Sequence, residues 1–299
     1  MKTELLLIRR NCRLFFKDLG MLLPSLCTPL ILLVLYATFL SNVYRDAFTA
    51  QLGPFALPDS LINGLVGGQL FSSLLAVSCV TVAFCSNLLM VQDKATGARR
   101  DLMIAPVKLS SLAVSYYAST MIVTLMVALV AMLACCIYLA VIGWYLSFAD
   151  ILLLLLDILI LAMFGTALSS IVNYFLSTQG QCSVVGTIVS SCYGFICGAY
   201  MPISGFSSGL RSTVSALPFA HGTSLLRNHA LAGAFREMES LGLPAELIEG
   251  MRDGVDCNLY VGDARVDVGT MYLTLIGSCL LLFVAFVLIH RFLRKKNIA

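Results

Sequence analysis

Residues 205–209 read GFSSG and match the G-x-S-x-G pattern, in which a strained turn presents a nucleophilic serine to a histidine base. His290 stands at the far end of another apolar run, about a membrane thickness from this serine. His221 and His229 are nearer, but no strand–turn–helix elbow is predicted around the motif. A Gly/Ser-rich turn is therefore the favoured interpretation, and an intramembrane serine hydrolase is the least supported function.

Asp157 is a carboxylate inside a long apolar run. An ionised group at that depth is costly, so it should face protein or water and either form a structural hydrogen bond or contact a transported substrate. Gln69 and Asn87 are weaker candidates of the same kind. A gradient-driven transporter or channel usually keeps several ionisable groups in the membrane and often has two similar halves. Here only Asp157 qualifies and no internal repeat is visible, so this class is an alternative with less support.

The chain lacks the sequence patterns that bind nucleotides, metals or nucleic acids. It has no G-x-x-x-x-G-K-[ST] loop and no Gly-Lys pair, so a phosphate-binding loop of that type is absent. The eleven cysteines form no CxxC or CxxH pair and nearly all lie in apolar stretches, which is typical of small hydrophobic residues. There is no basic tract with interleaved aromatic residues. We therefore expect no catalytic residue, cofactor or metal in this chain, and no nucleic-acid partner.

Composition indicates a membrane protein. Of the 299 residues 59% are hydrophobic and 12% are charged, and the mean hydropathy is +0.93; a soluble domain has roughly 25% charged residues. A helix needs about 20 apolar residues to cross the bilayer core. Apolar runs of sufficient length predict six transmembrane helices, at residues 21–41, 64–91, 112–141, 150–172, 183–201 and 269–290. The predicted fold class is an all-α polytopic membrane protein.

The basic residues predict the orientation of these helices. Thirteen of the 19 Lys and Arg residues lie before the first helix, between the second and third, or after the sixth. These segments share one side, which the positive-inside rule assigns to the cytoplasm, so both termini of this cell-membrane protein should be cytoplasmic. The predicted regions are an interface helix (1–20), helices one to five (21–201) with a cytoplasmic loop (93–110), an external segment (202–268), and the sixth helix with a basic tail (269–299).

The N-terminal segment has two faces when it is drawn as a helix. One face carries Leu5, Ile8, Cys12, Phe15, Phe16 and Leu19, and the other carries Lys2, Arg9, Arg10, Arg13 and Lys17. This pattern predicts an amphipathic helix on the inner leaflet, with an ordinary basic flank as the alternative. The apolar run that follows spans a full membrane without a small-residue cleavage site, so we do not expect a cleaved signal peptide.

The loop between the second and third helices combines charges with a glycine and a proline, reading DKATGARRDLMIAPV over residues 93–107. It resembles the corresponding loop of permeases in the type-2 ABC exporter family, which carries E-x-x-x-G-T-x-x-x-L-x-x-x-P. The matching positions are Asp93, Gly97, Leu102 and Pro106, with Asp in place of Glu and Ala98 in place of Thr.

Two further patterns extend this resemblance over nearly the whole chain. Residues 198–202 (GAYMP) and 218–227 (PFAHGTSLLR) are similar to the family's G-x-x-x-P and P-x-x-x-x-x-x-x-L-R elements. The resemblance implies short helices that dip back from the external face at 203–232. The insert at 234–267, with eight acidic and three basic residues, departs from the family pattern.

The resemblance also implies a function, namely the membrane permease of an ATP-driven exporter of hydrophobic or amphipathic substrates such as drugs, antibiotics or lipid-like molecules. A separate ABC ATPase subunit would bind ATP and Mg, and a second copy of this or a similar permease would complete the pathway across the lipid bilayer. The cytoplasmic loop would dock into the ATPase. The residues implied in this coupling are Asp93, Gly97, Arg99, Arg100, Asp101, Leu102 and Pro106.

Small residues recur every four positions in the fifth predicted helix, at Gly186, Ser190, Gly194 and Gly198. In lipid, small residues let helices approach closely. The stripe therefore predicts packing within one subunit, with a subunit interface or a transport pathway as alternatives.

Overall fold

The computed structural model describes residues 2–296, apart from 54, 105, 106 and 263. In chain order the elements are α1 (Lys2–Lys17), α2 (Leu19–Leu35), the π-helix η1 (Tyr36–Leu40), α3 (Ser41–Leu52), α4 (Asp59–Ala95), α5 (Ala98–Ile104), α6 (Leu109–Ile142), α7 (Phe148–Phe175), α8 (Gln179–Ile196), the 3₁₀-helix η2 (Ile203–Gly205), α9 (Ser208–Ser215), α10 (Pro218–Ser240), α11 (Ala245–Gly254), β1 (Leu259–Val261), β2 (Ala264–Val266) and α12 (Val268–Lys296). The protein is an all-α polytopic membrane protein, as the sequence predicts.

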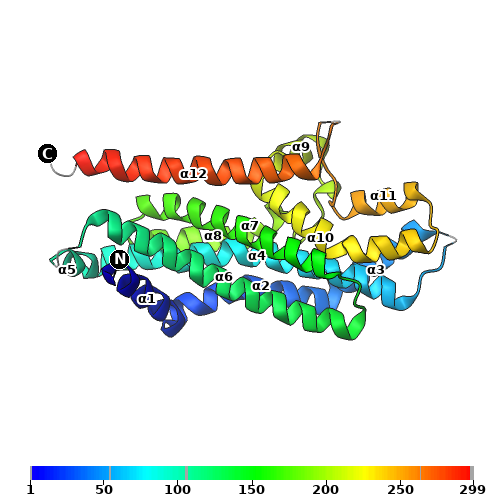
Figure 1. Cartoon of the computed structure of the whole chain (residues 1–299), viewed down its shortest axis with the longest axis horizontal. Coiled ribbons are helices and arrows are strands. Elements are labelled where there is room, and N and C mark those ends of the chain that lie inside the picture. Colours follow the sequence, from blue (N-terminus) through cyan, green and yellow to red (C-terminus); the bar gives the residue numbers. More distant parts are fainter. Residues whose placement is uncertain (1, 54, 105–106, 263, 297–299) are drawn as a thin grey trace.

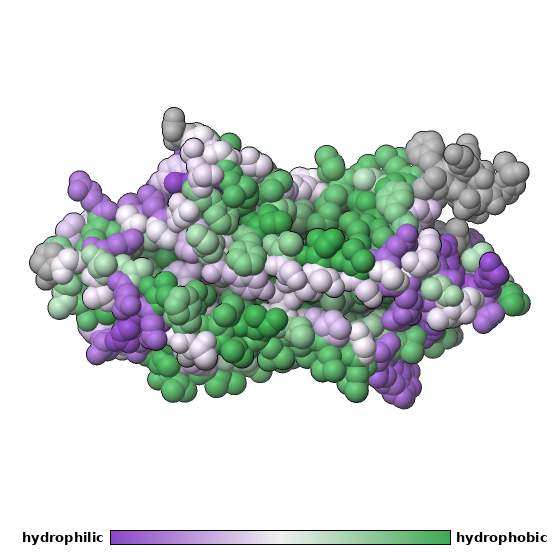
Figure 2. Space-filling view, turned by 180° about the vertical axis from the view of Figure 1, so that it is seen from behind, coloured by the Kyte–Doolittle hydropathy of each residue, from purple (hydrophilic) through white to green (hydrophobic). Residues whose placement is uncertain are grey.

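The long helices run along the long axis of the molecule and give it two distinct ends (Figure 1). The start of α1, the end of α12 and the short helix α5 lie at one end, and α3 and α11 lie at the other. Figure 2 shows hydrophilic residues at both ends and hydrophobic residues over the middle of the face that it presents. This distribution is typical of a bundle that crosses a bilayer. We call the two ends the α5 end and the α11 end.

Five stretches of the described chain are long and apolar enough to cross a membrane: Leu19–Leu52, Asp59–Ala95, Ser110–Ile142, Phe148–Phe175 and Val268–Ile289. α8 occupies the position of the fifth predicted span but is not among them, because Gln, Ser and Thr residues dilute its apolar character. Its 18 residues make it about 27 Å long, slightly less than the roughly 30 Å hydrocarbon core. The count of six crossings therefore stays a prediction.

α4 forms the centre of the bundle. Its apolar run is almost wholly buried, and it packs against α2, α6, α7, α8 and α10. Gly165 of α7 lies so close that a Cβ atom there would be 2.8 Å from the carbonyl oxygen of Cys79. Asn87, one of the polar residues in the α4 apolar run, points into the protein and donates from Nδ2 to the hydroxyls of Ser169 and Ser170, at 3.2 and 2.9 Å. Close backbone approach and internal hydrogen bonds stabilise helix packing in lipid.

α1 packs against α6 at the α5 end. The side chains that it buries are Leu7, Asn11 and Phe15. Leu5 and Phe16, which belong to the predicted apolar face, are exposed within the single chain. The helix thus places part of its apolar surface against the protein and leaves part outward, and its position on the inner leaflet stays a prediction.

The segment between α8 and α12 differs in part from what the family resemblance implies. η2 and α9 are short, but α10 has 23 residues, continues into the acidic insert and packs against α4, α7 and α12. The rest of the insert forms α11 and an antiparallel hairpin in which Leu259 pairs with Val266. The apolar and small residues of α10 allow it to pack among these three helices.

Candidate functional site

Asp93, the first residue of the predicted coupling loop, lies in the last turn of α4 and is buried. Arg10 of α1 donates to its two carboxylate oxygens at 2.8 and 3.1 Å, and the Tyr116 hydroxyl of α6 donates at 2.5 Å. The carboxylate therefore joins three helices at the α5 end. Because the carboxylate is buried, a partner protein could not contact it directly.

α5 follows Asp93 after a turn at Gly97, whose φ of +84° lies in the region that glycine adopts readily. Arg100 and Asp101 are exposed, Arg99 is half-buried, and Leu102 packs against the buried cluster of α1, α4 and α6. Pro106 lies outside the described residues.

The sequence-based set of coupling residues omits the two most exposed apolar residues of α5. Met103 is 51% exposed and Ile104 is 85% exposed. The sequence carried a signal that could have found them, since two adjacent apolar residues stand next to the charged residues 99–101 of the loop. Together with Arg100 and Asp101, they form what we call the α5 surface.

Asp157 lies on α7 and is engaged by side chains of two other helices. His229 Nδ1 of α10 is 2.6 Å from Asp157 Oδ2, and the Tyr272 hydroxyl of α12 donates to Oδ1 at 2.6 Å. Asp157 is 1% exposed. Both oxygens thus serve a structural tie between α7, α10 and α12, which corresponds to the structural-hydrogen-bond interpretation of this residue.

The GFSSG motif does not form a nucleophile elbow. Residues 205–209 connect η2 to α9, which is a turn between two helices and not between a strand and a helix. The motif is a Gly/Ser-rich turn, as favoured from the sequence.

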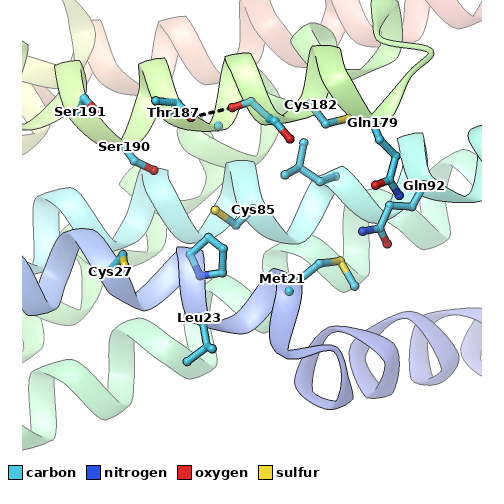
Figure 3. Close-up of a pocket in the computed structure, with 15 residues that line it drawn as sticks. Met21, Leu23, Cys27, Cys85, Gln92, Gln179, Cys182, Thr187, Ser190 and Ser191 are labelled. Carbon is cyan, nitrogen blue, oxygen red and sulfur yellow. Dashed lines mark hydrogen bonds between the residues drawn. The ribbon is translucent and has the colours of Figure 1, made fainter.

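A pocket of about 520 Å³ opens between α2, α4 and α8 (Figure 3). Its lining residues on α2 and α4 come from the start of α2 and the end of α4, so it lies in the half of the bundle nearer the α5 end. We call it the α2–α8 pocket. Its lining residues are Gly20, Met21, Leu23, Pro24, Cys27, Cys85, Leu88, Gln92, Gln179, Cys182, Ser183, Gly186, Thr187, Ser190 and Ser191. The volume falls within the roughly 300–1,000 Å³ typical of small-molecule sites.

The walls of the α2–α8 pocket differ in chemistry. α8 contributes mainly hydroxyl and amide groups, and Gln179 and Gln92 lie at the same end of the pocket (Figure 3). α2 and α4 contribute mainly apolar side chains and thiols, such as Leu23, Cys27 and Cys85. No charged side chain is among these described lining residues. The pocket therefore suits a molecule with an apolar part and neutral hydrogen-bonding groups.

The four small residues of the predicted stripe have different surroundings. Gly186 lines the pocket with open space where a Cβ would be, and the Ser190 carbonyl accepts a hydrogen bond from Thr28 of α2 at 3.4 Å. Gly194 leaves room for the ring of Tyr200, and Gly198 turns the chain at a φ of +75°. The stripe thus lines the pocket near the start of α8 and packs within the subunit near its end.

A buried ion pair joins the two patterns near the α11 end. Arg227 of α10, at the end of the L-R element, donates to Asp256 Oδ2 at 2.9 Å and to the carbonyl oxygen of Gly198 in the G-x-x-x-P element. Asp256 also accepts from the backbone N–H groups of Ile203 and Ser204, at 2.6 and 2.9 Å. Sequence reasoning missed Asp256, because nothing in the insert distinguishes it from seven other acidic residues.

The long apolar helices and the short helix α5 between the second and third of them are typical of a multi-pass membrane protein. The family model described as ABC-2 type transporter matches residues 4–230. The chain belongs to the ABC-2 type transporter family as a membrane component. Searches of curated proteins and of solved structures find no match.

Proposed function

We propose that this chain is the permease subunit of an ATP-driven exporter, and that its α2–α8 pocket receives an amphipathic cargo on the way out of the cell. Membership of the ABC-2 family supports the permease role. The observation that carries the cargo class is the pocket wall, which offers apolar side chains on one side and neutral amides and hydroxyls on the other. A charged cargo would lose hydration there without gaining a counter-charge.

Energy input is proposed to come from a separate ATPase subunit that docks on the α5 surface. The chain has no phosphate-binding loop of the G-x-x-x-x-G-K-[ST] type, so ATP and Mg would be held by that partner. Met103 and Ile104 would be covered by the partner, and Arg100 and Asp101 would fix its orientation. We propose that two permeases and two ATPase subunits form the complex.

Filling the pocket tests this proposal in proteoliposomes that contain the permease with its ATPase subunit. Gly186→Trp should lower ATP-dependent transport by at least about tenfold, because the indole has open space to occupy and would fill much of the pocket. Assembly and ATP hydrolysis should stay within about twofold of wild type. Gly277→Trp is the matched control, since Gly277 on α12 also has open space but lies outside the pocket.

Wild-type transport by the Gly186→Trp variant would refute the pocket assignment. Failure of the wild-type complex to transport amphipathic dyes on ATP addition would refute the exporter role, and ATP hydrolysis by the pure permease would refute the division of labour.

We propose that the α5 end faces the cytoplasm, which cysteine labelling of cells can test. A membrane-impermeant maleimide should reach Glu246→Cys on α11 and miss Arg100→Cys on α5. Native Cys257 should not react with the maleimide, because burial raises the pKa of its thiol to about 12 and keeps the thiol protonated at neutral pH. Labelling of Arg100→Cys without Glu246→Cys would mean that the orientation is reversed.

A further inference from the structure

Lys94, the residue after Asp93, joins the end of α4 to the end of α7. Its ammonium Nζ donates to the carbonyl oxygens of Tyr174 and Leu176 at 2.7 and 3.2 Å, and it lies 5.2 Å from the centroid of the Tyr174 ring. The last carbonyl groups of a helix lack donors within the helix and carry a partial negative charge. A buried or half-buried ammonium is therefore a strong partner for them, and Lys94 is half-buried.

The carbonyls that Lys94 binds stand at the beginning of a short link between α7 and α8. Leu176 is extended, with φ −80° and ψ 143°, and Thr178 is the extended N-cap of α8. The Thr178 hydroxyl accepts from the Gln181 N–H, and the Gln181 side chain accepts from the Thr178 N–H, so α8 is anchored at its first turn. Any displacement of this link moves the first turn of α8, where Gln179 lines the α2–α8 pocket.

α8 is also held less firmly than its neighbours. It packs mainly on α4, with a smaller contact to α2, and most of its side chains are exposed or half-buried within the single chain. α7, by contrast, packs against α4, α6, α10 and α12. Since the two helices meet at residues 176–178, this link is the natural place for α8 to pivot against a fixed α7.

We propose that Lys94 is a positioning residue that transmits movement of α5 to the α7–α8 link and thereby sets the opening of the α2–α8 pocket. This rests on the proposed function, in which α5 receives that movement from an ATPase. The connection is short, because Lys94 precedes the Gly97 turn by three residues and its ammonium reaches the link directly. Asp93 ties the same turn of α4 to α1 and α6, so the two adjacent charges connect the end of α4, just before α5, to separate groups of helices.

The first test is hydrogen–deuterium exchange on the full chain in micelles, which needs no ATPase. Lys94→Met should raise exchange at the amides of residues 176–183 by roughly tenfold, because a charge-assisted hydrogen bond contributes about that factor to local stability. Lys94→Arg should restore protection, since the guanidinium can donate to both carbonyls. Lys108→Met is the matched control, because Lys108 is an exposed lysine beside the start of α6.

The second test is the amount of transport per ATP hydrolysed by the reconstituted complex. Lys94→Met should lower this ratio by roughly tenfold while hydrolysis stays within about twofold, and Lys94→Arg should recover most of it. If Lys94 only caps α7, transport and hydrolysis would fall together with the amount of folded protein, and the proposal would be wrong. Unchanged exchange at residues 176–183 would also overturn it. A wild-type complex without ATP-driven transport would instead refute the proposed function, while unchanged exchange at residues 176–183 would separately refute the tie between Lys94 and the α7–α8 link.

Discussion

Replacing Arg227 with Met is expected to lower the free energy of unfolding by about 3–5 kcal/mol, because it leaves the Asp256 carboxylate buried without its counter-charge. Both side chains are nearly inaccessible, at 1% and 4% exposure. The same carboxylate holds the backbone N–H groups of Ile203 and Ser204, so the loss should loosen the connection from α8 to α9. Thermal or denaturant unfolding in micelles measures the change.

The matched control is Arg265→Met, which breaks the ion pair with Glu249 at the surface. That pair has an N–O distance of 3.4 Å, and its side chains are 50% and 47% exposed. Exposed pairs contribute about 0–1 kcal/mol, so the control should unfold almost as the wild type does. The double variant Arg227→Met with Asp256→Asn should recover part of the loss, because it removes both buried charges and keeps an amide oxygen that can accept from the backbone N–H groups at 203 and 204. Equal stability of Arg227→Met and Arg265→Met would contradict the importance assigned to the buried pair.

The second large effect is expected at the α5 surface. Ile104→Asp should weaken association with the ATPase subunit by more than about tenfold, because it places a charge where an apolar side chain, 85% exposed in the single chain, would be covered in the complex. The measurement is the affinity of the ATPase subunit for the purified permease, which is immobilised on a sensor surface. Ile104 is a cleaner test of coupling than Asp93, since substitution of Asp93 also breaks the contacts with Arg10 and Tyr116.

Leu241→Asp provides the control for this prediction. Leu241 is 51% exposed but follows α10 in the segment near the α11 end, where the cytoplasmic ATPase would have no access in the proposed orientation. Its substitution should leave the affinity unchanged. If Ile104→Asp and Leu241→Asp bind the ATPase equally well, the α5 surface is not the docking site.

The apolar runs determined much of the fold. A helix is the element that satisfies every backbone polar group within one segment in lipid, so an uncharged run of sufficient length predicts a helix with little ambiguity. The helix at Phe148–Phe175 appears where it was predicted. The loop motif likewise identified the segment in which α5 lies, because Gly97 favours a turn and the charges require a place outside the hydrocarbon.

The partners of the buried polar groups could not be predicted in this way. Asp93 was interpreted as part of an exposed loop, and Asp256 as one acidic residue among several. Each is instead a buried carboxylate that pairs with an arginine distant in the sequence, Asp93 with the partly exposed Arg10 and Asp256 with the buried Arg227. Which carboxylate meets which guanidinium depends on helix rotation and crossing, and neither leaves a periodic signal in the chain. The hairpin of β1 and β2 was not predicted for a related reason, since strands of three residues are too short to show alternation.

By itself, the sequence determined that this chain spans a membrane, that a charged loop with Gly97 separates two long apolar runs, and that its patterns resemble those of the family to which it belongs. Tertiary structure alone decided that α4 is the buried centre, that Asp157 is tied to His229 and Tyr272, and that α2, α4 and α8 enclose an uncharged pocket. The physical reason is that hydrophobicity acts locally along a chain and fixes where helices form. Packing and the pairing of buried polar groups are nonlocal, and they fix which faces of those helices meet.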